Sequence, residues 1–107
     1  MQKQTIAFIG QLSEKEIADL KEKNKAGIYA ISVGGHIAYF RNPTRQDINI
    51  AVSQLDQDNP MDYYEGLMRE TYVGGSKALM EEDRLYLGAV SQVRKKAEGD
   101  KAVLVNL

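Results

Sequence analysis

The sequence predicts an α+β domain in which an N-terminal helix and a β-hairpin are followed by three helices. Three observations support this class: a helix-start pattern at Ser13, a Gly34-Gly35 pair between two β-rich runs, and apolar stripes at helical spacing after Pro43. A chain of 107 residues can bury one core of moderate size, so residues 1–107 are expected to form a single domain.

The N-terminal segment, residues 1–11, is predicted to form either a short strand or an arm, because residues 5–9 are apolar or β-branched. A helix then begins after Ser13. Ser13 and Glu16 have the spacing of a capping box, in which each side chain accepts a hydrogen bond from the other residue's backbone N–H. The helix has a narrow apolar stripe and a charged opposite face, so we expect a surface helix that ends near Asn24.

The Gly34-Gly35 pair predicts a hairpin with a type I′ turn, because both central residues of that turn need positive φ. With this turn, the facing pairs on one apolar face of the sheet are Val33 with His36, Ile31 with Ala38, and Tyr29 with Phe40. The opposite face is only partly polar and carries Ile28, Ala30, Ser32, Ile37, Tyr39 and Arg41. An isolated hairpin is only marginally stable, so one face is expected to meet the helices and the other a further strand or another chain.

Pro43 removes a backbone donor and ends the second strand. Thr44 is the expected N-cap of the following helix, with Asp47 three residues further on. Apolar residues then recur at the i, i+3, i+4 and i+7 spacing of an amphipathic helix, at Ile48, Ala51, Val52 and Leu55.

Two further helices complete the predicted fold. Asn59 and Pro60 suit the N-cap and first turn of one helix, which Gly74 and Gly75 are expected to close with a left-handed glycine cap. A helical turn over residues 76–80 precedes a last helix from about residue 82 to residue 98.

The C-terminal residues 100–107 are too apolar for a solvent-exposed tail that makes no contacts, so they are predicted to form a strand or an arm that docks on another subunit. Together with the second face of the hairpin, they supply the apolar side chains that the helices need not cover. The predicted partner-binding residues are Ile28, Ile37, Tyr39, Val103, Leu104 and Val105.

Composition excludes several classes of function. The net charge is −1, without the basic excess of a nucleic-acid-binding protein. The absence of cysteine excludes disulfides, thiolate catalysis and thiolate metal sites. No stretch approaches the roughly 20 apolar residues of a membrane span. We therefore expect a soluble intracellular protein that binds neither nucleic acid nor membrane.

No catalytic, cofactor-binding or metal-binding residue is predicted. The single histidine, His36, has no evident Ser or Cys partner in the sequence, which favours a histidine at a sheet edge. The acidic residues 56–62 lack the glycine and the bidentate glutamate of a calcium-binding loop. The tripeptide Val-Gly-Gly occurs at residues 33–35 and again at residues 73–75, and neither copy has the glycine and lysine spacing of a phosphate-binding loop. A small enzyme or ligand-binding domain would need a pocket near His36 or near residues 56–62.

Three stretches of the chain together resemble small phage and prophage proteins of tail gene modules, of the tail assembly chaperone type. These stretches are "HIAYFRNPTRQDINIA", "DNPMDYYEGLMRETYVGGS" and "EEDRLYLGAVSQV". The shared pattern is a hairpin that ends in aromatic-Arg-x-Pro-x-Arg, an x-Pro break, a helix closed by Gly-Gly, and an acidic turn before Leu-Gly-Ala. The resemblance covers about residues 12 to 95.

The resemblance implies a non-enzymatic role in phage morphogenesis. A tail assembly chaperone binds the tape-measure protein, keeps its apolar helices soluble, and helps tail-tube subunits assemble in the cytoplasm of the bacterial host. The alternative is a structural component of the virion, a head–tail connector or tail terminator that forms rings. Both alternatives imply protein partners, and the second implies a homo-oligomer.

Overall fold

The computed structural model of the chain describes residues 8–53, 61–99 and 102–107. This part of the chain contains both helices and a three-stranded antiparallel sheet, and the α+β class is confirmed. The elements in order are α1 (Glu14–Lys23), β1 (Ile28–Val33), β2 (His36–Arg41), α2 (Arg45–Ser53), α3 (Met61–Thr71), β3 (Tyr72–Gly75), α4 (Ala78–Glu81) and α5 (Asp83–Ala97). The predicted helix start at Asn59 and Pro60, and residues 56–60 of the acidic turn, lie outside the described residues.

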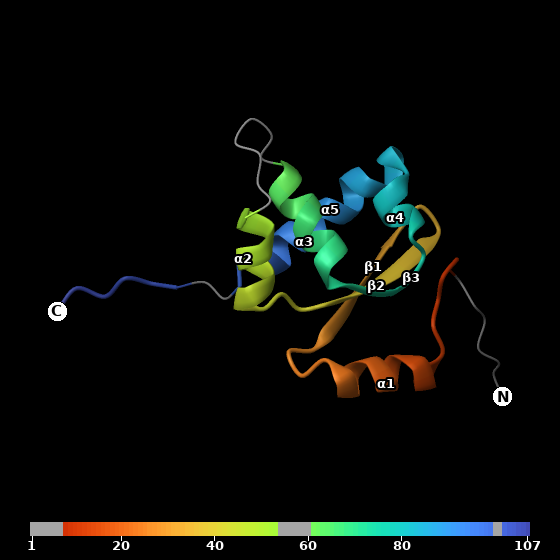
Figure 1. The fold of residues 1–107 in the computed structure, drawn as a ribbon, viewed down its shortest axis with the longest axis horizontal. Coiled ribbons are helices and arrows are strands. Elements are labelled where there is room, and N and C mark those ends of the chain that lie inside the picture. The colour runs from red at the N-terminus through yellow and green to blue at the C-terminus, as the bar shows by residue number, and fades with distance from the viewer. Residues whose placement is uncertain (1–7, 54–60, 100–101) are drawn as a thin grey trace.

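The described strands form one antiparallel sheet in the order β1-β2-β3, which lies between two helical layers. Figure 1 shows α1 alone on one side of the sheet and α3, α4 and α5 on the other. The N-terminal segment adds an isolated parallel bridge between Ile9 and His36. A strand or an arm is predicted for residues 1–11, and this bridge at Ile9 is the one strand-like contact of the described residues 8–11, since residues 1–7 lie outside the described part.

The hairpin prediction is confirmed in both turn and register. Gly34 and Gly35 have φ values of 59° and 83°, the positive values that a type I′ turn requires. The register pairs Val33 with His36, Ile31 with Ala38 and Tyr29 with Phe40, as the sequence predicted. Because side chains alternate along a strand, this register fixes which residues of the hairpin face the helical layer.

The helix starts predicted at Ser13 and Thr44 are also confirmed. The Ser13 N–H donates to the Glu16 carboxylate over 2.9 Å, and the Glu16 N–H donates to the Ser13 hydroxyl over 3.1 Å. The Thr44 N–H donates to the Asp47 carboxylate over 2.8 Å, and the Asp47 N–H donates to the Thr44 hydroxyl over 3.3 Å. In each pair, local side chains satisfy N–H groups that a helix start leaves free.

The prediction that Gly74 and Gly75 cap a helix is wrong. Gly74 and Gly75 do not cap a helix: α3 already ends at Thr71, and the chain continues directly as β3 along β2. A Cβ atom on Gly75, whose φ is +93°, would lie 2.7 Å from the Ala38 Cα. Gly75 is therefore required because β2 and β3 lie in close contact here. The helical pattern of the residues before it gave no sign of this contact.

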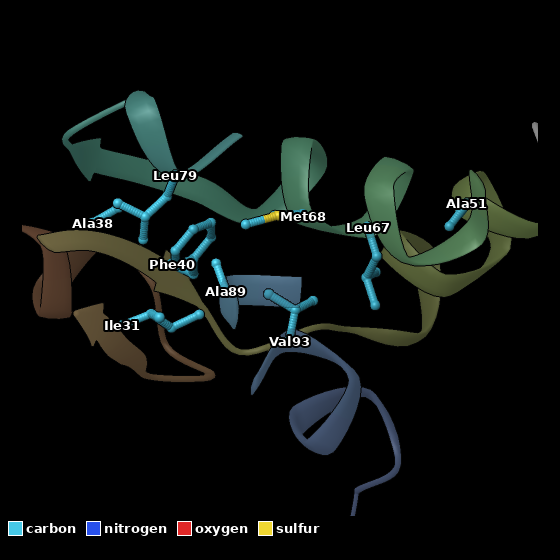
Figure 2. Packing of buried hydrophobic residues seen from close by; sticks show 9 residues of the cluster. All are labelled: Ile31, Ala38, Phe40, Ala51, Leu67, Met68, Leu79, Ala89 and Val93. Carbon is cyan, nitrogen blue, oxygen red and sulfur yellow. The ribbon is translucent and has the colours of Figure 1, made fainter. Parts of the chain in front are cut away.

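The core lies between the sheet and the large helical layer, as Figure 2 shows. Phe40 is fully buried at its centre, with its ring centroid 5.8 Å from that of Tyr29 and 6.0 Å from that of Tyr72. Leu67 and Met68 of α3 and Val93 of α5 are fully buried in the same cluster. Of the stripe predicted for α2, Ala51 is buried in this core, whereas Val52 is 52% exposed.

Arg41, the last residue of β2, connects the sheet to two helices. Its guanidinium forms a bidentate ion pair with Asp47 in α2, with one contact at 2.8 Å, and donates to the Glu70 carbonyl in α3 over 3.0 Å. Asp47 is only 3% exposed. Burial by itself raises the pKa of this carboxyl, but hydrogen bonds from Arg41 and Thr44 and the charge of Arg41 outweigh it, so the pKa lies below its ordinary value.

The C-terminal residues 102–107 form neither a strand nor a helix. Figure 1 shows them extending away from the sheet and the helices as an arm. Of the two predicted structures for this segment, the strand is therefore absent from the described residues, and the arm is what is observed.

We predict that Gly75→Ala destabilises the fold by at least about 3 kcal/mol. The new Cβ meets backbone atoms of Ala38 and Ile37, both at 2.7 Å, in addition to the cost of a positive φ. The matched control is Gly35→Ala, because Gly35 has φ +83° and nothing within 4 Å of its Cβ position. Urea unfolding should give the control a loss of only about 1–2 kcal/mol. Equal losses would contradict the close strand contact.

We predict that Arg41→Ala lowers the free energy of unfolding by about 2–3 kcal/mol at neutral pH, because it leaves the Asp47 carboxylate buried without its partner. Arg45→Ala is the control, since Arg45 is exposed. The pKa of Asp47 is lowered by folding, so the contribution of the pair is present above the unfolded pKa of about 4 and is lost as the pH falls through the folded pKa. The difference between wild type and Arg41→Ala should therefore shrink in acid. A constant difference would rule out the charge pair as its source.

Candidate interaction surface

The most exposed apolar side chains of the described residues lie in the C-terminal arm, which we define as residues 102–107. Val103, Leu104 and Val105 are 80%, 87% and 71% exposed, and Leu107 is fully exposed. Single apolar residues on a surface are common, whereas a run of exposed apolar residues makes the arm a candidate interaction segment. Three of the predicted partner-binding residues are thus accessible.

The predicted outer face of the hairpin is only partly available. Tyr39 was predicted to be accessible, but it is 5% exposed, so this prediction is wrong. The N-terminal segment accounts for the burial: the Leu12 N–H donates to the Tyr39 hydroxyl over 3.3 Å. On the other side of Tyr39, β3 approaches closely through its glycines, and the Cβ position of Gly75 lies 3.1 Å from the Tyr39 ring.

The two other predicted hairpin residues, Ile28 and Ile37, are half-buried. The exposed residues of the outer face are instead Ala30 and Ser32, both in β1. The cover of this face therefore reaches β2 and β3 and leaves part of β1 open. The sequence could not predict that β2 is covered and part of β1 is not, because the apolar pattern of residues 13–24 does not show which strands this helix packs on.

The arm and the hairpin do not converge on one surface. Figure 1 shows the arm leaving the molecule on the side of α2 and pointing away from the sheet. The chain just after α5 lies beside the segment before β1, because Gly99 shares the lining of an open cleft of about 610 Å³ with Ala26 and Asn42. Lys95, Lys96 and Pro43 complete that lining.

A smaller cleft of about 240 Å³ lies between α1 and β3. Its apolar lining consists of Leu12, Leu20 and Val73, and its charged rim of Glu16, Asp19 and Lys23. Of its own residues, α1 buries none completely. The helix therefore covers the outer face through a thin apolar contact.

His36 has a partner that the sequence did not reveal. Its Nδ1 atom lies 2.8 Å from the hydroxyl oxygen of Ser76, forty residues further along the chain. The Ser76 hydroxyl also accepts from the Ala78 N–H over 3.3 Å, and the Ser76 N–H donates to the Ile37 carbonyl over 2.9 Å. These bonds place Ser76 at the corner where β3 leads into α4, and they join that corner to the start of β2.

Residues 8–53, 61–99 and 102–107 contain no group of three or more acidic or histidine side chains that could hold a metal ion. No helix among these residues has both the length and the apolar character needed to cross a bilayer. Comparisons with protein families, with curated proteins and with solved structures find no match to this chain.

We predict that the contact between His36 and Ser76 stabilises the corner by about 1 kcal/mol of coupling free energy, the usual contribution of one hydrogen bond. The measurement is a double-mutant cycle of His36→Ala and Ser76→Ala in urea unfolding. His36→Ala with Ser53→Ala is the control cycle, because Ser53 lies in α2 and bonds its own helix. The control should be additive within about 0.5 kcal/mol. Additivity in both cycles would mean that the observed contact contributes nothing.

Proposed function

We propose that the chain is a non-enzymatic morphogenesis protein of a phage or prophage, of the tail assembly chaperone type. In this proposal it acts in the cytoplasm of the bacterial host and binds a tape-measure or tail-tube protein. The observation that carries the proposal is the exposed apolar arm, in which Val103, Leu104 and Val105 lie free of the domain that bears them.

The chemistry of the arm suits such a partner. An extended apolar segment can add to the edge of a partner's sheet through main-chain hydrogen bonds, or cover apolar helices, with its side chains giving the specificity. The folded part of the chain supports the arm, because α5 leads to its base and packs through Leu85, Ala89 and Val93 into the core. The resemblance of residues 12 to 95 to tail-module proteins supplies the identity of the expected partner.

The motif that carries the resemblance has a structural explanation here. Phe40 fills the core, Arg41 pairs with Asp47, and Asp47 with Thr44 caps α2. This part of the motif therefore builds the joint between sheet and helices. The partner-binding role is assigned to the arm, which lies outside the motif.

The test is a pull-down of the tape-measure or tail-tube protein encoded beside this chain. The variant Val103→Asp with Val105→Asp places two charges on the apolar arm and should reduce capture at least about tenfold, since each charge would have to be buried in the contact. Asn106→Asp is the control, because it adds a charge at a polar position of the same arm. Tyr39 is unsuitable for this test, since its substitution would disturb the packed interior.

Two outcomes would count against the proposal. Undiminished capture by the doubly charged variant would remove the arm from the binding surface. Detection of the chain by mass spectrometry in purified mature particles would favour the alternative, a connector or terminator that remains in the virion.

A further inference from the structure

The outer edge of β1 is open. In the described part of the chain, β1 is an edge of the sheet, and its only neighbouring strand is β2. The N–H group of Ile37, in β2, donates to the Ile9 carbonyl, and the Ile37 carbonyl accepts from the Ser76 N–H. Both partners lie on the side of β2 away from β1. Because Ile37 faces Ser32, that pair is not hydrogen-bonded in the antiparallel ladder. The N–H and C=O groups of Ser32 therefore point away from β2.

The same alternation applies along the rest of the strand. Ala30 and Ile28 lie two and four residues before Ser32, so their backbone groups also point outward. Ala30 and Ser32 are exposed, which agrees with an uncovered edge. Three successive donor–acceptor pairs are thus available to one further strand.

Nothing in β1 protects this edge. Natural edge strands avoid pairing through short length, charged side chains, proline or a bulge. The six residues of β1, "IYAISV", include neither a charge nor a proline, and the irregularity of the sheet lies between β2 and β3. By contrast, the opposite edge strand, β3, has only four residues.

The arm matches this edge in length and in polarity. Both segments have six residues and span about 20 Å when extended. Alternate arm residues point to opposite sides, so Val103, Val105 and Leu107 form one wholly apolar row. The helix-covered face of β1 is likewise apolar, with Tyr29, Ile31 and Val33, whereas its other face carries the small exposed residues Ala30 and Ser32.

We propose that the arm of one copy of this chain adds as a fourth strand to the open β1 edge of a second copy. The proposal commits to a second copy because every copy carries both the unprotected edge and an apolar segment of matching length, while its own arm points away from its own sheet (Figure 1). An arm that joins one copy to the next produces a dimer or a ring where the contacts close on themselves, and an open filament where they do not. This contact concerns two copies of the chain and does not depend on a tail protein.

The first measurement is light scattering of the purified full chain over a series of concentrations, without any partner. We expect a discrete oligomer that dissociates on dilution. Ala30→Pro removes an outward N–H without breaking a bond to β2, and Val105→Asp charges the apolar row of the arm. Each should raise the dissociation constant at least about tenfold. A monomer at all concentrations would overturn the proposal.

The controls differ from these variants in one property each. Ala30→Val keeps the N–H, and Asn106→Asp adds the same charge at a polar position of the arm, so both should change the dissociation constant less than about threefold. Circular dichroism establishes that each variant is folded. An oligomer that Ala30→Pro and Val105→Asp leave unchanged would show that another surface forms it.

The second measurement does not require a proline to be tolerated. Because the chain has no cysteine, single cysteines report contacts directly. A copy with Ala30→Cys is mixed under oxidising conditions with copies carrying Val103→Cys, Leu104→Cys or Val105→Cys. At least one mixture should give a mixed disulfide dimer, whereas Ala18→Cys, exposed on α1, should give none above background. A disulfide that forms only within one chain, when both cysteines are in the same copy, would assign the edge to the chain's own arm.

The outcome is separable from that of the proposed function. Ala30→Pro removes an outward N–H of the edge but leaves the arm intact, so it should weaken self-association and still capture the tail protein. Loss of self-association with retained capture supports both proposals. Retained self-association with no capture of either tail protein supports only the contact between copies.

Discussion

The ion pair between Arg41 and Asp47 is the interaction on which the arrangement of this domain depends. Asp47 is buried, and a buried carboxylate is tolerated only when a charged partner and hydrogen bonds replace the water it has lost. Arg41 supplies that partner from the end of β2 and also reaches the Glu70 carbonyl near the end of α3. The Arg41 side chain thus holds the start of α2 and the end of α3 against the end of β2.

The sheet is asymmetric, and this asymmetry leaves one of its edges for contacts. On one side of β2, Gly74 and Gly75 allow β3 to approach closely enough for Tyr39 to be enclosed. On the other side, β1 has no further strand in the described part of the chain. The sequence predicts a binding surface on the outer face of the hairpin, but the N-terminal segment covers the β2 part of that face. The available groups are the backbone edge of β1 and the side chains of the arm.

The two functional proposals use one physical property of the chain. Apolar surface that a small domain cannot cover within itself tends to be covered by association, because removing it from water is favourable. The arm carries such surface at Val103, Leu104 and Val105. In the proposals, a tail protein and a second copy of the chain each supply that cover, and the β1 edge would add directional hydrogen bonds only with the second copy.

Local patterns in the sequence determined much of this structure. The capping pairs at Ser13 and Thr44 and the hairpin register around Gly34 are set by residues within a few positions of one another, so they could be predicted and were confirmed. The apolar composition of residues 100–107 left a strand and an arm open, and the structure shows the arm over residues 102–107. Tertiary structure alone decided the role of Gly75, the burial of Tyr39 and the contact of His36 with Ser76, because each depends on segments more than 25 residues apart meeting in space. Periodicity describes which face of an element is apolar, but only packing selects the element that covers it.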